Sequence, residues 1–366
     1  MSDSILKEVA FTPQAFDKEF NLSNNRRFGK LITILDTLIE SGIILAASSS
    51  WKKNIYELLE NYEDSDKSEL AALLKELDSR ERIVTYPSSK QLDSEKSWIS
   101  EINHLNRQRA FDFIAGTVNE GIVQTVESIE RKKYLNSGAV VTMQTKENMH
   151  KMLAPILSYA EIVTIIDPYF QFSVKRYEES FEVICENLGN NHDVKSEAII
   201  DIHTSIKPLL NRDKEFVWQQ ADHWPRVIKS FEKKYGHKIT LYIWEEVRKQ
   251  NEWHDRWLIT NQCGISIGKG SDVSNWTDST WSLLDWDVLP EITAKFNKNR
   301  SLFNFIGTVT SESVIKNQNP KNTSTYMTDS EKADDREKYL AEIEKKKQEA
   351  KNKKTVTTKS GIRKKV

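Results

Sequence analysis

The sequence predicts an α/β protein whose larger part is a sandwich of helices packed on a mixed sheet. Strand and helix patterns alternate from residue 139 to about residue 310, which is typical of this class. The 366 residues suffice for two ordinary domains, and 38% hydrophobic with 29% charged residues is a globular composition. We therefore expect a separate α/β or mainly helical N-terminal domain over residues 1–138, the sandwich over residues 139–324, and a charged, basic, helical or disordered tail over residues 325–366.

The N-terminal part combines helix and strand patterns. Apolar residues recur at helical spacing over residues 68–79, where Ser68 is a suitable N-cap. Short apolar runs that follow such patterns predict strands. The elements expected here are helices over residues 68–79 and 120–135 and strands over residues 42–46 and 82–87.

Residues 8–20 could form a first strand that ends in a polar loop, as in small nuclease domains where an aspartate at a strand end holds a metal. The carboxylates available for such a site are Asp17, Glu101 and Asp112. Scattered carboxylates more often form a solvated face, so we expect neither a metal nor a cofactor at the functional site.

The central part alternates more clearly between strands and helices. Eight of the ten Trp lie between Trp218 and Trp286, and most of these rings are expected in a core or at a partner surface. The expected elements are strands over residues 139–143, 161–170, 196–205 and 237–246, helices over residues 145–160, 174–188 and 214–236, and a hairpin of residues 256–260 and 264–268.

Charge and cysteine content bear on the partners and the compartment. Residues 345–366 carry a net charge of +9 while the chain as a whole carries −1, which leaves about −10 for the rest. A basic tail could contact nucleic acid or an anionic membrane, although a solvated terminus is the commoner role. Cys185 and Cys263 are the two cysteines, and no apolar run approaches the length of a membrane helix, so we expect a cytoplasmic protein.

The stretch HDRWLITNQCGISIGKGSD, residues 254–272, carries the most informative chemistry. His254 and Arg256 alternate along an extended segment, so their side chains point to the same side. The loop after the hairpin adds further groups that suit a phosphate oxyanion: backbone N–H groups at glycines and two polar side chains. We expect phosphate to be bound by Arg256, Gly268, Lys269, Gly270 and Ser271.

These residues resemble the His-x-Lys-(x4)-Asp-(x6)-Gly motif of the phospholipase D superfamily. The chain has His254, Arg256, Asn261 and Gly268 at the four motif positions. It is most similar to the phospholipase-D-like C-terminal domain of MIT-domain proteins, whose pattern is His-Asp-Arg followed by Gly-x-x-Ile-x-Ile-Gly-Arg-Gly-x-Asp. An earlier Ile-x-Asp-Pro-Tyr, residues 165–169, matches as well, and the resemblance covers residues 139–310.

The resemblance implies a phospholipase-D-like sandwich and a metal-independent phosphodiesterase. Its catalytic residues would be His254, Arg256 and Asn261, with His254 as nucleophile or general acid. Bacterial relatives with the His-Asp-Arg motif look like antiphage effectors, which implies a nuclease, a hydrolase of nucleic acid, in a microbial antiviral defence or stress system with protein partners.

In an alternative interpretation, the chain binds phosphate on nucleic acid or anionic phospholipid without cleaving it. Catalytic members of the superfamily have two such motifs per site, from one chain or from a homodimer, and this chain shows one. Arg256 stands at the lysine position and Asn261 at the aspartate position. MIT-linked domains of this kind are thought to bind phospholipid membranes.

Three further residues could border the same site. Asp167 and Tyr169 follow a strand, and a carboxylate at the carboxyl end of a strand often borders the ligand crevice of an α/β sheet. Asp167-Pro168 could equally form a simple turn. His203 is expected at a strand end, where a structural role is more common than a place in a site.

Overall fold

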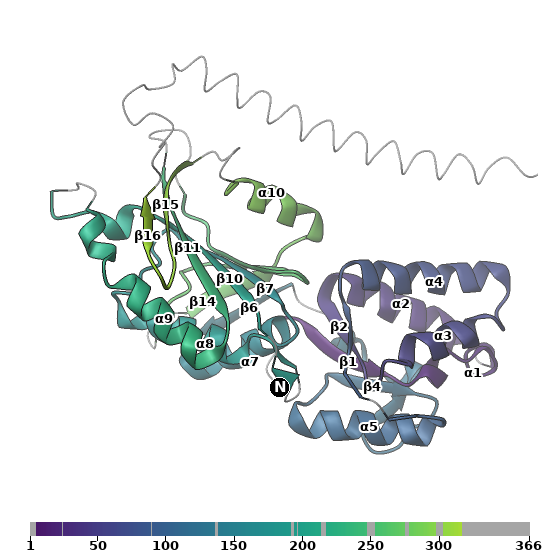
Figure 1. Ribbon diagram of the computed structural model, residues 1–366. Coiled ribbons are helices and arrows are strands. Elements are labelled where there is room, and N and C mark those ends of the chain that lie inside the picture. Colours follow the sequence, from purple (N-terminus) through teal and green to yellow (C-terminus); the bar gives the residue numbers. More distant parts are fainter. Residues whose placement is uncertain are drawn as a thin grey trace, which may run out of the picture. The chain divides into compact units, whose positions relative to one another are not determined.

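A computed structural model of the chain describes residues 5–23, 25–88, 90–135, 138–191, 194–195, 197–213, 217–246, 253–274, 278–297 and 303–316. These residues belong to one compact unit that spans residues 1–317. The tail expected over residues 325–366 lies outside the described residues. The structure confirms an α/β protein with a mixed sheet (Figure 1).

The first sheet is parallel and has the strand order β3-β2-β1-β4-β5. Strands β1 and β2 are buried along their whole length. β2 is a continuous apolar run, as is usual for parallel strands covered by helices, whereas β1 begins with the buried charged residues Lys7 and Glu8. The strands are β1 (Lys7–Phe11), β2 (Gly42–Ala46), β3 (Ile83–Thr85), β4 (Phe113–Gly116) and β5 (Val123–Thr125). The helices are α1 (Lys18–Leu22), α2 (Asn25–Ser41), α3 (Trp51–Leu59), α4 (Asp64–Ser79), α5 (Glu95–Gln108) and α6 (Arg131–Tyr134).

The second sheet has nine strands in the order β16-β15-β11-β10-β7-β12-β13-β14-β6. Strands β7, β10 and β11 are parallel, and the remaining neighbours pair antiparallel, which makes the sheet mixed. Its strands are β6 (Ala139–Met143), β7 (Ile162–Ile166), β10 (Ile199–Ser205), β11 (Lys238–Glu245), β12 (Trp257–Thr260), β13 (Gly264–Ile267), β14 (Asp278–Leu283), β15 (Asn304–Val309) and β16 (Val314–Lys316).

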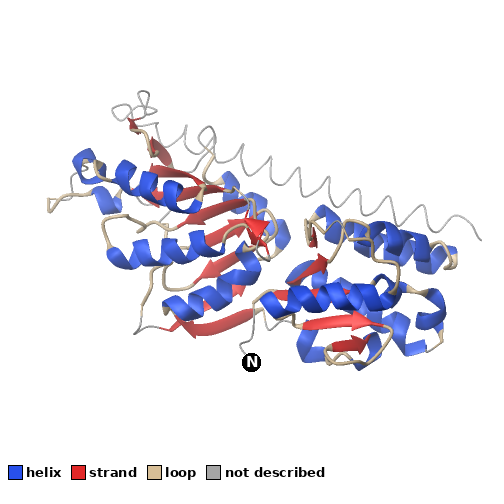
Figure 2. Cartoon of the chain, turned by 60° about the horizontal axis from the view of Figure 1, so that its bottom comes forward, coloured by secondary structure: helices blue, strands red, loops and turns tan. Residues whose placement is uncertain are grey.

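Helices cover both faces of this sheet. Alternate strand residues such as Ile165 and Ile202 belong to the main core, which also includes the apolar sides of α7 (Lys146–Leu157), α8 (Lys175–Asn187) and α9 (Trp224–Tyr235). Ile166 and Trp257 face the other way, into a smaller core with Leu289 of α10 (Leu289–Ala294). Figures 1 and 2 show helices lying along the strands of the sheet. A short ribbon of β8 (Asn190–Asn191) and β9 (Val194–Lys195) completes the described elements.

Two expected helices differ from the structure. Residues 120–135 form β5, a 3₁₀ turn and the short helix α6, because Gly121 takes a left-handed φ of 60° and β5 pairs with β4. The helix expected over residues 214–236 begins only at Trp224, where Pro225 occupies the first turn. In addition, α4 begins before Ser68, whose hydroxyl donates to the Asp64 carbonyl instead of capping the helix.

No helix in the described ranges is both long and apolar enough to cross a bilayer.

Candidate functional site

The pairing of β12 with β7 brings the two matched motifs together. The strands are antiparallel, with Trp257 opposite Ile166. The residues just before β12 therefore lie beside the residues just after β7, and Arg256 reaches Asp167. The Nε atom of Arg256 lies 3.8 Å from Oδ1 of Asp167.

Asp167 is fully buried, and its carboxylate holds the site together. Oδ1 accepts a hydrogen bond of 2.9 Å from the backbone N–H of Tyr169. Oδ2 accepts two from Ser271, at 3.1 Å from the backbone N–H and 2.8 Å from the hydroxyl. A buried carboxylate is tolerated only when it is paired and hydrogen-bonded, so these contacts fix Asp167 between the end of β7 and the loop after β13.

The loop after β13 has a fixed backbone with an exposed tip. Gly268 donates its N–H to the Thr280 carbonyl (2.9 Å), and Lys269 donates its N–H to the Ser279 hydroxyl (3.2 Å). Gly268 and Lys269 are exposed, whereas Gly270 is buried. Lys269 therefore presents its ammonium group to solvent from a loop whose backbone is held on both sides.

Gly270 is required by the conformation of this loop. Its φ of 113° is a region that residues with a Cβ rarely adopt, and a Cβ here would lie 2.7 Å from Oδ1 of Asp272. The Gly270 carbonyl accepts a hydrogen bond from the Gln144 side chain. The turn at Gly270 directs Ser271 towards Asp167.

Two further cations lie at the same edge of the sheet. Lys207, just after β10, lies 5.1 Å from the ring centre of Tyr169, and Arg256 lies 5.2 Å from it. Arg176, in the first turn of α8, pairs with Asp272 at 3.1 Å. Burial raises the pKa of Asp272, and the positive charge of Arg176 opposes that rise.

Arg256 is oriented by its surroundings and retains donor capacity. Its Nη1 donates to the His254 carbonyl at 3.1 Å, while its buried Nε has no hydrogen-bond partner among the described residues. His254 is exposed at the start of the same extended segment. We call the following residues the edge cluster: Asp167, Tyr169, Arg176, Lys207, His254, Arg256 and residues 268–272.

The structure does not bring Asn261 to the edge cluster. Asn261 follows β12 whereas Arg256 precedes it, and five residue steps along a strand span roughly 16 Å. Oδ1 of Asn261 accepts the backbone N–H of Glu161 (3.1 Å), at the opposite end of β7 from Asp167. Asn261 therefore has a structural contact in the hairpin turn.

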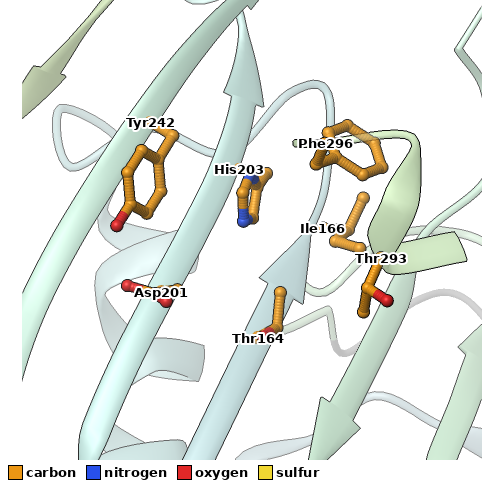
Figure 3. A pocket seen from close by; sticks show the side chains of 7 residues that line it. All are labelled: Thr164, Ile166, Asp201, His203, Tyr242, Thr293 and Phe296. Atoms are coloured by element: carbon orange, nitrogen blue, oxygen red, sulfur yellow. The ribbon is translucent and has the colours of Figure 1, made fainter. Parts of the chain in front are cut away.

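Only the backbone of His203 lies near the edge cluster. Its carbonyl accepts the Asp167 N–H at 3.0 Å, but its ring lies on the face of the sheet that carries α10. There it lines a separate cavity, which Figure 3 shows, and its Nδ1 accepts from Nε1 of Trp244 at 3.0 Å.

The carboxylates considered for an N-terminal metal site have separate structural contacts. Asp17 caps α1 by accepting the N–H of Phe20, and Glu101 pairs with Lys90 at 2.6 Å. Asp112 lies before β4 and accepts the N–H of Glu8 near the start of β1. Within the described ranges, no group of three or more His, Cys, Asp or Glu side chains is arranged to hold a metal ion.

Three residues in or beside the edge cluster, Arg176, Lys207 and Gln144, were not identified from the sequence. Arg176 and Lys207 follow strands β7 and β10, and a search for cations soon after each strand of the parallel core would have found both. Gln144 follows the distant edge strand β6, and its contact with Gly270 has no signal in the sequence.

Comparisons with known proteins do not identify a family. No model of a known protein family matches the chain, and no curated protein matches it. A solved structure of TrmBL2, an archaeal chromatin protein described as showing a novel mode of DNA binding, aligns with 70% of this chain and 71% of its own at 11% identity. Its TM-score is 0.26, too low to support any argument about fold or function.

Proposed function

We propose that the chain is a phospholipase-D-like phosphodiesterase that acts on nucleic acid at the edge cluster. The main support for this proposal is that three cationic side chains, Arg176, Lys207 and Arg256, lie near the carboxyl ends of β7 and β10. Lys269 is exposed on the adjoining loop, and His254 is exposed two residues before Arg256. Guanidinium and ammonium groups at a sheet edge suit a phosphodiester, which carries one negative charge. The proposed setting is a microbial antiviral defence system, with the nuclease as effector.

In the proposed reaction, a ring nitrogen of His254 attacks phosphorus. A P–N bond forms, the P–O bond to one nucleoside breaks, and the leaving oxygen takes up a proton. Arg256 and Lys269 stabilise the charge on the non-bridging oxygens. Water then hydrolyses the phosphohistidine and regenerates His254. A second copy of the chain, related by a two-fold axis, would supply the histidine that protonates the leaving oxygen.

A second candidate is a module that binds phosphodiesters without cleaving them. Among the described residues, His254 is the histidine of the matched motif, whereas the His203 ring faces the cavity beside α10. Asn261 lies at the far end of β12. The described residues of this arrangement supply cations for binding but no second histidine that could donate a proton to the leaving oxygen.

Binding measurements with Arg256→Ala test the feature that both candidates share. Fluorescence anisotropy with labelled single-stranded DNA and RNA, and co-sedimentation with vesicles containing phosphatidylserine, would identify the ligand class. We expect Arg256→Ala to weaken nucleic-acid binding about tenfold. Lys229→Ala, an exposed lysine on α9, is the matched control. Equal affinity of Arg256→Ala and wild type at low salt would exclude the edge cluster as the binding site.

A further inference from the structure

Positively charged side chains gather on one surface of the part of the chain that holds the first sheet. They come from the start of α2 and from α6, two helices that are far apart in the sequence. Three of these side chains are exposed and three are half-buried. We call the following residues the basic patch: Arg26, Arg27, Lys30, Arg131, Lys132 and Lys133.

Side-chain contacts hold the two segments of the basic patch next to each other. Arg27 of α2 pairs at 2.6 Å with Glu127, which lies in the 3₁₀ turn before α6. The Nζ atom of Lys30 lies 4.7 Å from the ring centre of Tyr134, the last residue of α6. The Tyr134 ring is buried in the main core. The six cations therefore belong to one surface whose backbone is fixed.

The basic patch keeps a net positive charge after its ion pairs are counted. Glu127 pairs with Arg27, and Glu130 pairs with Lys132 at 2.8 Å. Six cations and these two carboxylates leave a net charge of +4. Arg131 makes no ion pair within the described ranges, and the Lys132 ammonium has three N–H donors, more than one ion pair uses. Both of these exposed side chains can therefore bind a further anion.

Helix stability does not account for this charge. The first turn of α2 contains Arg26 and Arg27 but no acidic residue. Cations at the amino end of a helix oppose its dipole, which favours Asp or Glu there. The positive charge at this position therefore lowers the stability of the helix, and a bound anion would offset that cost.

Charge complementarity indicates which kind of partner the basic patch fits. Residues 345–366 of the chain itself carry a net charge of +9, so this segment is repelled. A second copy related by a two-fold axis would present the same positive surface and is repelled as well. An anionic membrane is disfavoured, because the exposed Leu22 and Leu135 are single side chains and not the continuous apolar face that an interfacial helix inserts.

We propose that the basic patch binds the phosphate backbone of double-stranded nucleic acid. Lys and Arg side chains bind such a backbone through its charge, without reading the sequence. Proteins that hold single strands also stack the bases on exposed aromatic rings. The aromatic residues of the two segments, Phe28 and Tyr134, pack against the core instead, so a duplex whose bases are already stacked fits this surface better. This inference goes beyond the edge cluster, because it requires neither cleavage nor phosphate binding there.

Fluorescence anisotropy of the full chain with short labelled DNA and RNA duplexes, across a series of potassium chloride concentrations, tests the proposal. The double variant Arg131→Gln, Lys132→Gln removes two charges from exposed side chains. We expect the slope of log K against log salt for the DNA duplex to fall by about 1.8, and the affinity at low salt to fall about tenfold. The double variant Lys53→Gln, Lys75→Gln removes two exposed charges from α3 and α4 and is the matched control, which should keep the wild-type slope.

Three further arms complete the experiment, with thermal unfolding used to verify that each variant folds. Arg131→Lys keeps the charge and should keep the slope. The glutamine pair is repeated in the Arg256→Ala protein, where the same fall in slope separates the basic patch from the edge cluster. Single-stranded DNA and vesicles containing phosphatidylserine are measured with the same variants. An unchanged slope for the glutamine pair on both duplexes, or a loss of affinity confined to single strands or vesicles, would overturn the proposal.

Discussion

Ser271 donates both its backbone N–H and its hydroxyl to Oδ2 of Asp167, at 3.1 Å and 2.8 Å. This pair of bonds ties the loop after β13 to the end of β7, two segments that are 104 residues apart in the sequence. Because Asp167 is fully buried, the partners of its carboxylate decide whether the negative charge is tolerated.

We expect Ser271→Ala to lower the free energy of unfolding by about 1–3 kcal/mol, because a buried carboxylate loses a hydroxyl donor. Urea denaturation monitored by tryptophan fluorescence measures this change. Ser230→Ala, at an exposed position on α9, is the matched control and should change stability by less than about 0.5 kcal/mol. Equal stability of the two variants would show that the Ser271 hydroxyl does not hold the loop.

Gly270→Ala should distort the loop that presents Lys269. The φ of 113° and the approach to Asp272 make any Cβ strained, at a cost of about 1–3 kcal/mol. Gly29→Ala is the opposite case, since Gly29 lies in α2 with open space around its Cα and should gain about 0.5–1 kcal/mol. Thermal unfolding of both variants gives the sign of each change, and a neutral Gly270→Ala would contradict the assigned loop conformation.

Lys269→Ala should reduce the salt dependence of nucleic-acid binding. If Lys269 contacts one phosphate, the slope of log K against log salt falls by about 0.7–0.9. Affinity measured across a series of potassium chloride concentrations gives the slope, with Lys229→Ala as the reference for a lysine outside the site. An unaltered slope for Lys269→Ala would remove this side chain from the phosphate contacts.

Glu182→Gln should destabilise the protein only at pH values at which the Glu182 carboxylate is ionised. Hydrogen bonds from Lys146 and Lys234 lower the pKa of Glu182 to about 2 from a usual 4.5. The folded state therefore favours the carboxylate, so the stabilisation is complete above pH 4.5 and is lost as the pH falls through about 2. Both ion pairs are partly exposed, which limits the loss at pH 7 to about 1 kcal/mol.

Urea denaturation of wild type and Glu182→Gln between pH 7 and pH 2 tests this expectation. The difference in unfolding free energy should shrink across the lower part of this range. Glu69→Gln on α4 serves as the control, because Glu69 makes no ion pair within the described ranges. A difference that persists unchanged at pH 2 would mean that Glu182 contributes packing alone.

The hairpin and the contact between the two motifs could be predicted from the sequence. Alternation of His254 and Arg256 before an apolar run, with a glycine-rich loop after it, indicates a strand pair with polar groups at one edge. By the same rule, Asn261 cannot lie beside His254 and Arg256, because it follows the four residues of β12 and so lies at the opposite end of that strand. The position of Arg256 beside Asp167 then depends only on β12 pairing antiparallel with β7.

The order of the strands and the direction of single side chains could not be predicted. Asp167 follows β7, and His203 lies within the neighbouring parallel strand β10, two residues before its end at Ser205 rather than at the end as expected. Only the tertiary structure decides that the imidazole lies on the α10 face. Residues 120–135 carry an amphipathic pattern, but pairing of β5 with β4 overrides helical propensity there. Gln144 reaches Gly270 from an edge strand, and such long-range contacts have no local signal.

A cleavage assay of purified wild type and His254→Ala with EDTA present is the direct test of phosphodiester cleavage by His254. The substrates are labelled single- and double-stranded DNA, RNA and phospholipid, and nucleic-acid binding is measured on the same samples. We expect wild type to cleave nucleic acid without metal, and His254→Ala to bind it with wild-type affinity without cleaving it. Binding without cleavage by wild type would assign the edge cluster to a phosphate-binding module, and cleavage by His254→Ala at the wild-type rate would contradict the role of His254.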